Sequence, residues 1–337
     1  MKPAAGVNFV YGENASGKTS LLEALFVLGR GRSFRAGRRD ALIREGTGRA
    51  RVIADGESRN GEFRAGVAIR PGDSELRMDG RPATGVAEVA ERMPVEVIDP
   101  DAHRLVAEGP AERRRYLDWS VFHVEHGFLG EWRRYQRALR QRTVLLRRGA
   151  HSREIEPWEQ EMDARGLAVD RARERVLAGI APIVQELGER LLGSGIRLTY
   201  RPGQPSDAPL AELLASGRDR DARMAQTMVG PHRGDVQVEI HDRRARGRVS
   251  RGQQKLVAAA MILGQHRYQV ANTGESGIVL MDDVSAELDR VRVARLLEAL
   301  ADTPGQLFVT ALDKADLADR PHERMFHVER GNVTAVV

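Results

Sequence analysis

The sequence predicts an α/β fold that is interrupted by a helical insertion, and three observations lead to this prediction. Short apolar segments near both ends of the chain stop at a glycine or an acidic residue and lead into helical patterns. Between about residues 117 and 191 the apolar residues instead recur at steps of three and four, which is typical of long amphipathic helices. From residue 222 the α/β pattern returns. We therefore expect a discontinuous α/β domain, residues 1–112 and 222–337, and a helical insertion, residues 113–221.

The first α/β segment is predicted to hold a strand at residues 7–11, a helix at residues 18–28 and short antiparallel strands between residues 50 and 100. The insertion is predicted to be a helical hairpin with an arginine-rich face, broken near Gly149 and Pro157 and kinked at Pro182. Residues 201–222 have the composition of a loop. The remaining elements are predicted as strands or helices at residues 236–240, 253–264, 277–281, 289–301 and 307–310.

The composition is that of a globular protein with a basic charge balance. The chain has 337 residues, a net charge of +5 and a pI of about 9.8, which is compatible with an anionic partner. It has no cysteine, which excludes disulfides and zinc–thiolate sites. No stretch approaches the roughly 18–20 apolar residues of a membrane span, and the first residues do not resemble a signal peptide. We therefore expect a cytoplasmic protein with no membrane partner.

Lysine is rare in this chain. Of the 53 basic residues only four are lysine, and codon bias in a GC-rich genome is the main explanation. Where lysine is retained, however, the position can require an ammonium group in place of any cation. The four positions are Lys2, Lys18, Lys255 and Lys314.

A phosphate-binding loop follows the first predicted strand and matches the pattern G-x-x-x-x-G-K-[ST]. Its glycines allow backbone N–H groups to converge on phosphates, and the next helix directs its positive end at them. Lys18 would neutralise the β- and γ-phosphates, and the Thr19 hydroxyl would bind Mg²⁺. The sequence therefore predicts ATP and Mg²⁺ as cofactors. The predicted binding residues are Gly12, Glu13, Asn14, Ala15, Ser16, Gly17, Lys18, Thr19 and Ser20.

Two carboxylates follow the apolar strand at residues 277–281, where a P-loop fold places its magnesium-organising acid. Asp282 is the predicted metal residue, acting through water, together with Thr19. Asp283 is the predicted catalytic residue, a general base that accepts a proton from the attacking water.

A third motif indicates an ABC-type ATPase. Ser250, Gly252 and Gln253 lie at the start of a predicted helix and resemble the ABC signature. The Ser250 hydroxyl and the helix N-terminus can bind the γ-phosphate of an ATP held by a second protomer. The same residues also fit a helix cap, and we expect both descriptions to hold. Residues 285–289 resemble the D-loop of a dimer interface. The predicted fold class is thus α/β, a P-loop ABC-type ATPase head with an inserted helical hairpin.

These motifs resemble the RecF family, in the SMC-like branch of the ABC ATPases. Besides the phosphate loop, the matching stretches are residues 29–35, 112–118, 230–235, 282–289 and 326–331. The resemblance implies a homodimer that binds ATP and gapped or junction DNA, acts with RecR and helps to load the RecA recombinase. Slow, DNA-stimulated ATP hydrolysis would then serve as a timer.

Three points of difference matter: one from the RecF family, one from transporter ATPases, and a glutamine lid that the sequence does not place. The phosphate loop begins only 12 residues into the chain, whereas relatives carry further strands before it, and a late-assigned start codon is the preferred interpretation. Thr310 stands where transporter ATPases carry a switch histidine, so Asp283 would act without a histidine partner.

Several smaller signals remain open from the sequence alone. His232 is more typical of a structural than of a catalytic histidine. The tryptophans of the insertion favour core packing over base stacking, and its arginine-rich face favours DNA over a merely solvated surface. Two other functions are alternatives: an ATPase subunit of a membrane transporter, and a structural repair subunit that binds ATP without hydrolysing it.

Overall fold

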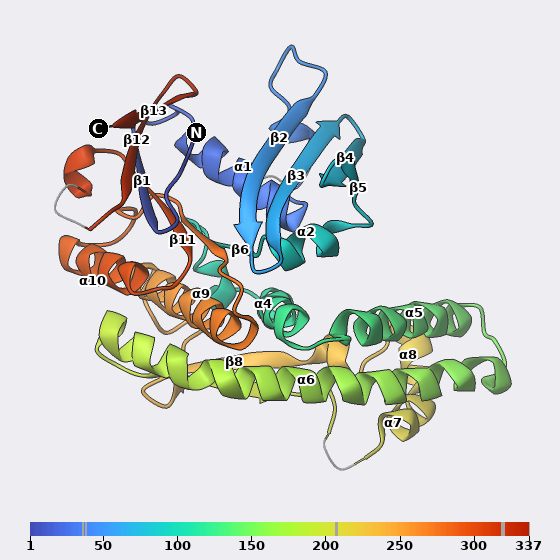
Figure 1. Ribbon diagram of the computed structural model, residues 1–337. Coiled ribbons are helices and arrows are strands. Elements are labelled where there is room, and N and C mark those ends of the chain that lie inside the picture. Colours follow the sequence, from blue (N-terminus) through green and yellow to red (C-terminus); the bar gives the residue numbers. More distant parts are fainter. Residues whose placement is uncertain (36, 38, 206–207, 318–320, 337) are drawn as a thin grey trace. The chain divides into compact units, whose positions relative to one another are not determined.

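The computed structural model describes residues 1–35, 37, 39–205, 208–317 and 321–336 (Figure 1). The chain divides into two compact units, which we call the head and the helical unit. The head comprises Met1–His103, Leu187–Gly193 and Ser250–Val337, and the helical unit comprises Arg104–Glu186 and Ser194–Val249. The limits of the helical unit differ from those of the predicted insertion, residues 113–221. The predicted limits remain a proposal.

A six-stranded sheet forms the centre of the head. Five of its strands run parallel, and the sixth, β13, pairs antiparallel at one edge. The spatial order is β13 (Asn332–Val336), β12 (Arg324–Glu329), β1 (Val7–Tyr11), β11 (Gln306–Ala311), β10 (Ile278–Met281) and β6 (Val95–Ile98). The chain turns that follow β1, β10 and β6 therefore meet at one edge, where ligands bind in open parallel sheets.

Helix α1 (Lys18–Arg30) lies between this sheet and a second, antiparallel one. The second sheet contains β2 (Ala50–Ser58), β3 (Gly61–Arg70), β4 (Asp73–Met78) and β5 (Arg81–Pro82), as predicted, but the predicted antiparallel strands do not extend to residue 100, because residues 86–92 form a helix and β6 pairs parallel with β10. Apolar side chains of α1 are buried against both sheets. Leu22 and Phe26 share one core cluster with Val67 of β3, Leu280 of β10 and Phe308 of β11, together with residues of helix α2 (Val86–Arg92).

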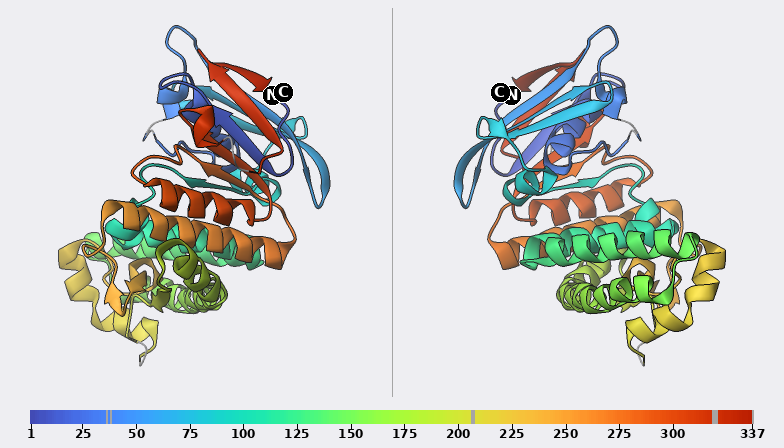
Figure 2. Two further views of the ribbon diagram at one scale, coloured as in Figure 1. Left: turned by 90° about the vertical axis from the view of Figure 1, so that its left-hand side faces the viewer. Right: turned by 90° about the vertical axis from the view of Figure 1, so that its right-hand side faces the viewer.

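Two further helices cover the opposite side of the six-stranded sheet (Figure 2). They are α9 (Arg251–Thr273) and α10 (Arg290–Ala301). Helix α9 runs past Gly264, where the predicted helix ended, and stops at Gly274. Gly274 adopts a φ of 67°, a left-handed conformation that glycine tolerates and that ends helices.

The helical unit is built around two antiparallel helices, α5 (Phe128–Arg147) and α6 (Ser152–Leu192). Ion pairs from Glu131 to Arg165 and from Arg134 to Glu161 join them. The end of α6, from Leu187, is counted with the head. The other elements are α3 (Arg104–Ala107), α4 (Pro110–Val124), β7 (Ile196–Arg201), α7 (Leu210–Ser216), α8 (Arg218–Met224), β8 (Asp235–Ile240) and β9 (Arg243–Arg244).

Three details of the predicted hairpin were wrong. Its first arm is two helices, because Gly127 adopts a φ of 89° and separates α4 from α5. The predicted break at Pro157 does not occur, since α6 continues through Pro157 and buries Ile155 and Met162 on either side of it. The predicted loop at residues 201–222 contains α7 and most of α8, because Leu210 and Leu214 pack into the core beside α5. Among the described helices, none has the length and low charge needed to cross a bilayer.

Candidate functional site

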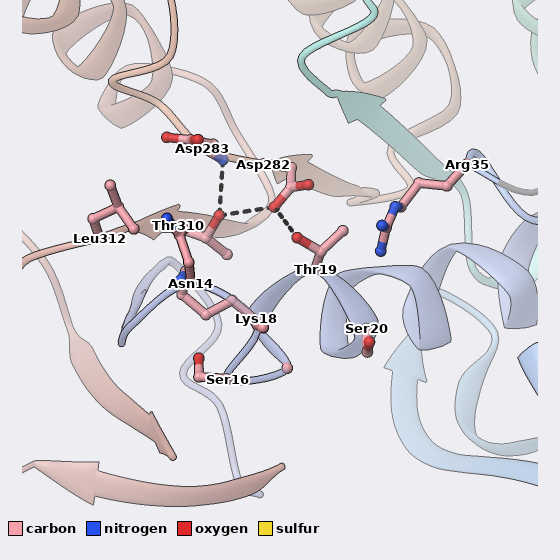
Figure 3. A pocket seen from close by; sticks show the side chains of 12 residues that line it. Asn14, Ser16, Lys18, Thr19, Ser20, Arg35, Asp282, Asp283, Thr310 and Leu312 are labelled. Carbon is pink, nitrogen blue, oxygen red and sulfur yellow. Dashed lines mark hydrogen bonds between the residues drawn. The ribbon is translucent and has the colours of Figure 1, made fainter. Parts of the chain in front are cut away.

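A cavity of about 340 Å³ opens at the carboxyl edge of the six-stranded sheet (Figure 3). The loop between β1 and α1 forms its floor, and the ends of β10 and β11 form the opposite wall. It brings together residues that lie far apart in the sequence. The lining residues are Asn14, Ala15, Ser16, Gly17, Lys18, Thr19, Ser20, Arg35, Asp282, Asp283, Thr310 and Leu312.

The loop of residues 12–17 has a backbone that only certain residues allow. Gly12 has a φ of 156°, and a Cβ atom there would meet the Val328 carbonyl oxygen at 2.3 Å. Gly17 has a φ of 112°, in the left-handed region that favours glycine. Ala15 also has a positive φ, 61°, which costs a residue with a Cβ about 1–3 kcal/mol. The Gly331 N–H donates to the Ser16 carbonyl at 2.7 Å and ties the loop to the β12–β13 turn.

Two polar groups at this loop, the Lys18 ammonium and the Ser16 hydroxyl, are buried without an anion or a hydrogen-bond acceptor that would fully satisfy them. Lys18 is 9% exposed, and among the described residues its ammonium donates only to the Gly12 and Glu13 carbonyls, at 2.6 and 2.8 Å. Burial lowers the pKa of Lys18, while the carboxylates of Asp283 and Asp282 act in the opposite direction. The buried Ser16 hydroxyl bonds to none of the described residues. Because buried polar groups are normally satisfied, the loop is suited to receive an anion with several acceptor oxygens.

A chain of three oxygens crosses the cavity at the ends of the strands. The Thr19 hydroxyl donates to a carboxylate oxygen of Asp282 at 3.1 Å, and the Thr310 hydroxyl donates to the same oxygen at 3.0 Å (Figure 3). Burial raises the pKa of Asp282, although the hydrogen bonds from Thr310 and Thr19 act to lower it. Oxygen ligands of this kind, one carboxylate and one hydroxyl at a phosphate site, are those Mg²⁺ prefers.

Asp283 begins a strained loop beside this chain of oxygens. It has a φ of 52°, in the left-handed region, and Glu287 further along has a φ of 65°. The Asp283 N–H donates to the Thr310 hydroxyl at 2.8 Å, and its carboxylate accepts from the Ser285 hydroxyl at 3.2 Å. Such conformations persist when surrounding contacts hold them. The Asp283 carboxylate is therefore fixed at the wall of the cavity.

The predicted signature residues lie at the start of α9 and do not line this cavity. Ser250 and Gln253 form a capping box: the Ser250 hydroxyl accepts from the Gln253 N–H at 3.3 Å, and the Gln253 side chain accepts from the Ser250 N–H at 2.9 Å. Gly252 lies against the Glu287 carbonyl, which a Cβ atom would approach to 3.0 Å. The predicted helix cap is thus confirmed, and the contact of these residues with a second protomer's nucleotide stays a prediction.

The structure adds one residue that lines the cavity, Arg35, and one neighbour of Asp282, Asp99, neither of which the sequence revealed. Arg35 points its guanidinium into the cavity from the segment after α1 (Figure 3), and the only signal was its place in the stretch of residues 29–35. Asp99 follows β6 and lies next to Asp282, because Ile98 pairs with Met281. Burial, with the charges of Asp101 and Asp282, raises the pKa of Asp99 to about 6.

His232 and part of the arginine-rich run have structural roles in the helical unit. The His232 ring bonds to the Tyr135 hydroxyl at 2.7 Å and to the Thr227 carbonyl at 2.9 Å, and burial lowers its pKa to about 4. Arg113 is 5% exposed and pairs with Asp235 at 2.8 Å. Trp158 packs against two apolar clusters, in line with its predicted packing role.

Comparisons with known proteins agree with this geometry. A family model described as the RecF/RecN/SMC N-terminal domain matches residues 1–334. The DNA replication and repair protein RecF of Shewanella sp. (strain W3-18-1) is 36% identical over 339 residues, which cover 99% of this chain and 94% of that protein. The RecF protein of Stenotrophomonas maltophilia (strain R551-3) is 37% identical over 351 residues, covering 100% and 95%.

A solved structure supports the same fold. The structure of the recombination mediator protein RecF-ATP in the RecFOR pathway superimposes with a TM-score of 0.87 at 23% identity, covering 100% of this chain and 93% of that one. These similarities leave no support for the transporter alternative. The fold is that of a P-loop ABC-type ATPase, and the chain belongs to the RecF family of DNA replication and repair proteins.

Proposed function

We propose that this chain is an ATP-gated DNA-binding repair protein of RecF type. Two copies would close around two ATP molecules and hold gapped or junction DNA, and the closed dimer would act with RecR in loading the RecA recombinase. The observation that carries the proposal is the cavity itself, in which the buried Lys18 ammonium and the unbonded Ser16 hydroxyl face the Thr19–Asp282–Thr310 oxygens. The relatives are DNA replication and repair proteins, which supports the DNA-repair role.

ATP binding would use the loop first. Lys18 would exchange its two carbonyl contacts for β- and γ-phosphate oxygens, and Ser16 would gain an acceptor. Thr19 and Asp282 fit a Mg²⁺ ion, which supplies neutralisation of the β- and γ-phosphate charge. Arg35 adds a second cation at the same cavity.

Hydrolysis would depend on Asp283. Its carboxylate lies past Asp282 on the same wall and is held by Ser285 and by the backbone bond to Thr310. It would accept a proton from a water molecule that attacks the γ-phosphate. Asp283 has no histidine neighbour among the cavity residues, so slow turnover is expected.

The dimer and the DNA would use two exposed surfaces. Ser250 is exposed at the start of α9, where its hydroxyl and the helix N-terminus can receive the γ-phosphate of a partner's ATP. Arg133, Arg137 and Arg140 of α5 are exposed at spacings of four and three residues, which puts them on one helix face. Among the described residues they form no ion pair. Backbone phosphates are the partners that such a row fits.

Analytical sedimentation tests the proposal. The wild type and Ser250→Arg are compared with and without ATP and Mg²⁺ and a gapped duplex. We expect ATP to shift the wild type from monomer to dimer and the dimer to carry DNA. The variant should stay monomeric, because the longer, charged side chain would block the place of the partner's nucleotide. Ser216→Arg, the same exchange at an exposed position of the helical unit, should behave as wild type. A wild type that stays monomeric with saturating ATP and ignores DNA at moderate salt would contradict the proposal.

A further inference from the structure

Lys255 is a buried ammonium that serves no part of the nucleotide site directly. It lies in the second turn of α9, and its side chain is 0% exposed. Its ammonium donates to the Ala286 carbonyl at 2.9 Å and to the Asp283 carbonyl at 3.3 Å. Within the described part of the chain it forms no ion pair, and it does not line the cavity. A fully buried charge with only carbonyl partners is costly, so its retention calls for a role.

The loop that Lys255 holds is the one that carries Asp283. Asp283 and Glu287 both have positive φ values, 52° and 65°, without being glycine. The Asp283 N–H is fixed by the Thr310 hydroxyl of β11 at 2.8 Å, and its carbonyl is fixed by Lys255 of α9. The Asp283 N–H is thus held by β11 and its carbonyl by α9, while the Val284 N–H donates to the Thr310 carbonyl at 3.1 Å and the Ala286 N–H donates to the Asp283 carbonyl at 3.2 Å. Removing Lys255 would take the ammonium donor from the Asp283 and Ala286 carbonyls and would weaken the hold on the left-handed conformation of the loop.

The presence of lysine and not arginine at residue 255 fits this role. The chain uses arginine at 49 of its 53 basic positions, yet lysine stands at residue 255. An ammonium is compact and directs three donors from one point, whereas a guanidinium is a larger planar fork. Two carbonyls of one tight turn, Asp283 and Ala286, suit the compact donor.

We propose that Lys255 is a positioning residue that holds the Asp283 loop and links it to the first turn of α9. Because Ser250 caps the N-terminus of α9, the segment proposed to face the partner's nucleotide is joined through this helix to Asp283 of its own site. Lys255 sets the turnover number and takes no part in binding ATP. The inference rests on the proposed function, since it assigns how Asp283 is kept in place for hydrolysis.

Steady-state kinetics with DNA and Mg-ATP test this inference on Lys255→Met and Lys255→Arg. We expect the Met variant to lose at least about tenfold in kcat while the KM for ATP changes less than about twofold, since only the transition state needs the placed acid. The Arg variant should not restore turnover. Leu263→Ala is the matched control, because Leu263 is equally buried on the same helix but does not bond to the loop. It should lower the melting temperature and leave kcat per folded molecule unchanged.

Hydrogen exchange of residues 282–289 keeps the two proposals separable. The Val284 N–H donates to the Thr310 carbonyl of β11 and the Ala286 N–H donates to the Asp283 carbonyl, and both amides should exchange faster in Lys255→Met than in wild type or Leu263→Ala. If the wild type hydrolyses no ATP, the proposed function fails. The role of Lys255 in holding the loop is then tested by the hydrogen-exchange rates alone. Unchanged exchange, kcat within about twofold of wild type, or a KM that rises as kcat falls would each overturn it.

Discussion

The head and the helical unit each bury a basic side chain, and the two are held in opposite ways. Arg142 of α5 is 0% exposed, and its guanidinium donates to Glu159 at 3.0 Å, Asp221 at 2.8 Å, Thr227 at 2.8 Å and the Leu214 carbonyl at 2.8 Å. Lys18 of the head is almost as deeply buried, but within the described ranges its ammonium bonds only to two carbonyls of the neighbouring loop.

The difference separates a structural charge from a binding charge. Around Arg142 two carboxylates balance the guanidinium, and nothing is left for a ligand to satisfy. Around Lys18 the positive charge faces an open cavity, and the nearest carboxylates, Asp282 and Asp283, act on it through space without bonding to it. Both regions thus bury a cation. The structural cation has all of its hydrogen bonds satisfied by the protein, and the binding cation does not.

Removing Arg142 is expected to have the largest effect. Arg142→Met leaves the buried carboxylates of Glu159 and Asp221 with only the more exposed Arg218 and Arg220 as ion-pair partners among the described residues, which should cost the helical unit about 3 kcal/mol. Urea unfolding followed by tryptophan fluorescence reports this unit alone, because Trp119, Trp132 and Trp158 are the only tryptophans and all lie in it. Arg140→Met, at an exposed position of the same helix, is the control. A loss below about 1 kcal/mol would mean that the network is not structural.

Removing Lys18 should leave stability almost unchanged and weaken nucleotide binding. Lys18→Met removes a charge-assisted contact to phosphate, so the Kd for ATP should rise about 100-fold, or about 2.7 kcal/mol. Fluorescent-nucleotide titration measures the affinity, and thermal unfolding without nucleotide measures the stability. Lys314→Met, at an exposed position, should change neither quantity. If Lys18→Met destabilised the apo protein as much as Arg142→Met does, the contrast between the two regions would be lost.

A buried histidine sharpens the comparison, since it lies in the head yet is fully satisfied. The His266 ring lies 2.9 Å from a Glu96 carboxylate oxygen and 2.7 Å from the Pro304 carbonyl oxygen. The carbonyl oxygen and an ionised Glu96 carboxylate both accept hydrogen bonds, and this pair of partners suits an imidazolium, whose two ring nitrogens both donate. Burial acts to lower the pKa of His266, but the Glu96 carboxylate and the two hydrogen bonds raise it above its ordinary value.

The sign of the pH dependence follows from that raised pKa. The pair stabilises the head fully below the unfolded pKa of about 6.5, and this contribution is lost as pH rises through the folded pKa. Relative to Glu96→Gln, the wild type should therefore be more stable by about 1.5 kcal/mol at about pH 6, with a smaller advantage at about pH 9. Urea unfolding followed by far-UV circular dichroism at both pH values measures the difference. An advantage that is constant or grows with pH would argue against an imidazolium at this site.

The sequence predicted local features well and contacts between distant segments poorly. The strand at residues 7–11 and the phosphate loop are local patterns, and the structure has both. The end of α9 was misplaced because the sequence offers two glycines, and only packing decides that Gly274, and not Gly264, adopts the left-handed turn. Arg35 and Asp99 reach the site through the pairing of distant strands and a loop, which no local pattern encodes. Lys255 was notable from composition alone, but its two carbonyl partners lie 28 and 31 residues away in the sequence.

The burial of Lys18 and Lys255 also has a consequence for protease sensitivity. All four lysines lie in the head, and the helical unit contains none. A lysine-specific protease can cut the native head only at the exposed Lys2 and Lys314, near its two ends. Cleavage after Lys255 requires α9 to unfold, and the helical unit gives no cut in any state. The rate at which the fragment ending at Lys255 appears would therefore measure how often α9 of the head unfolds. Unfolding of the helical unit would add no cleavage product to the same digest.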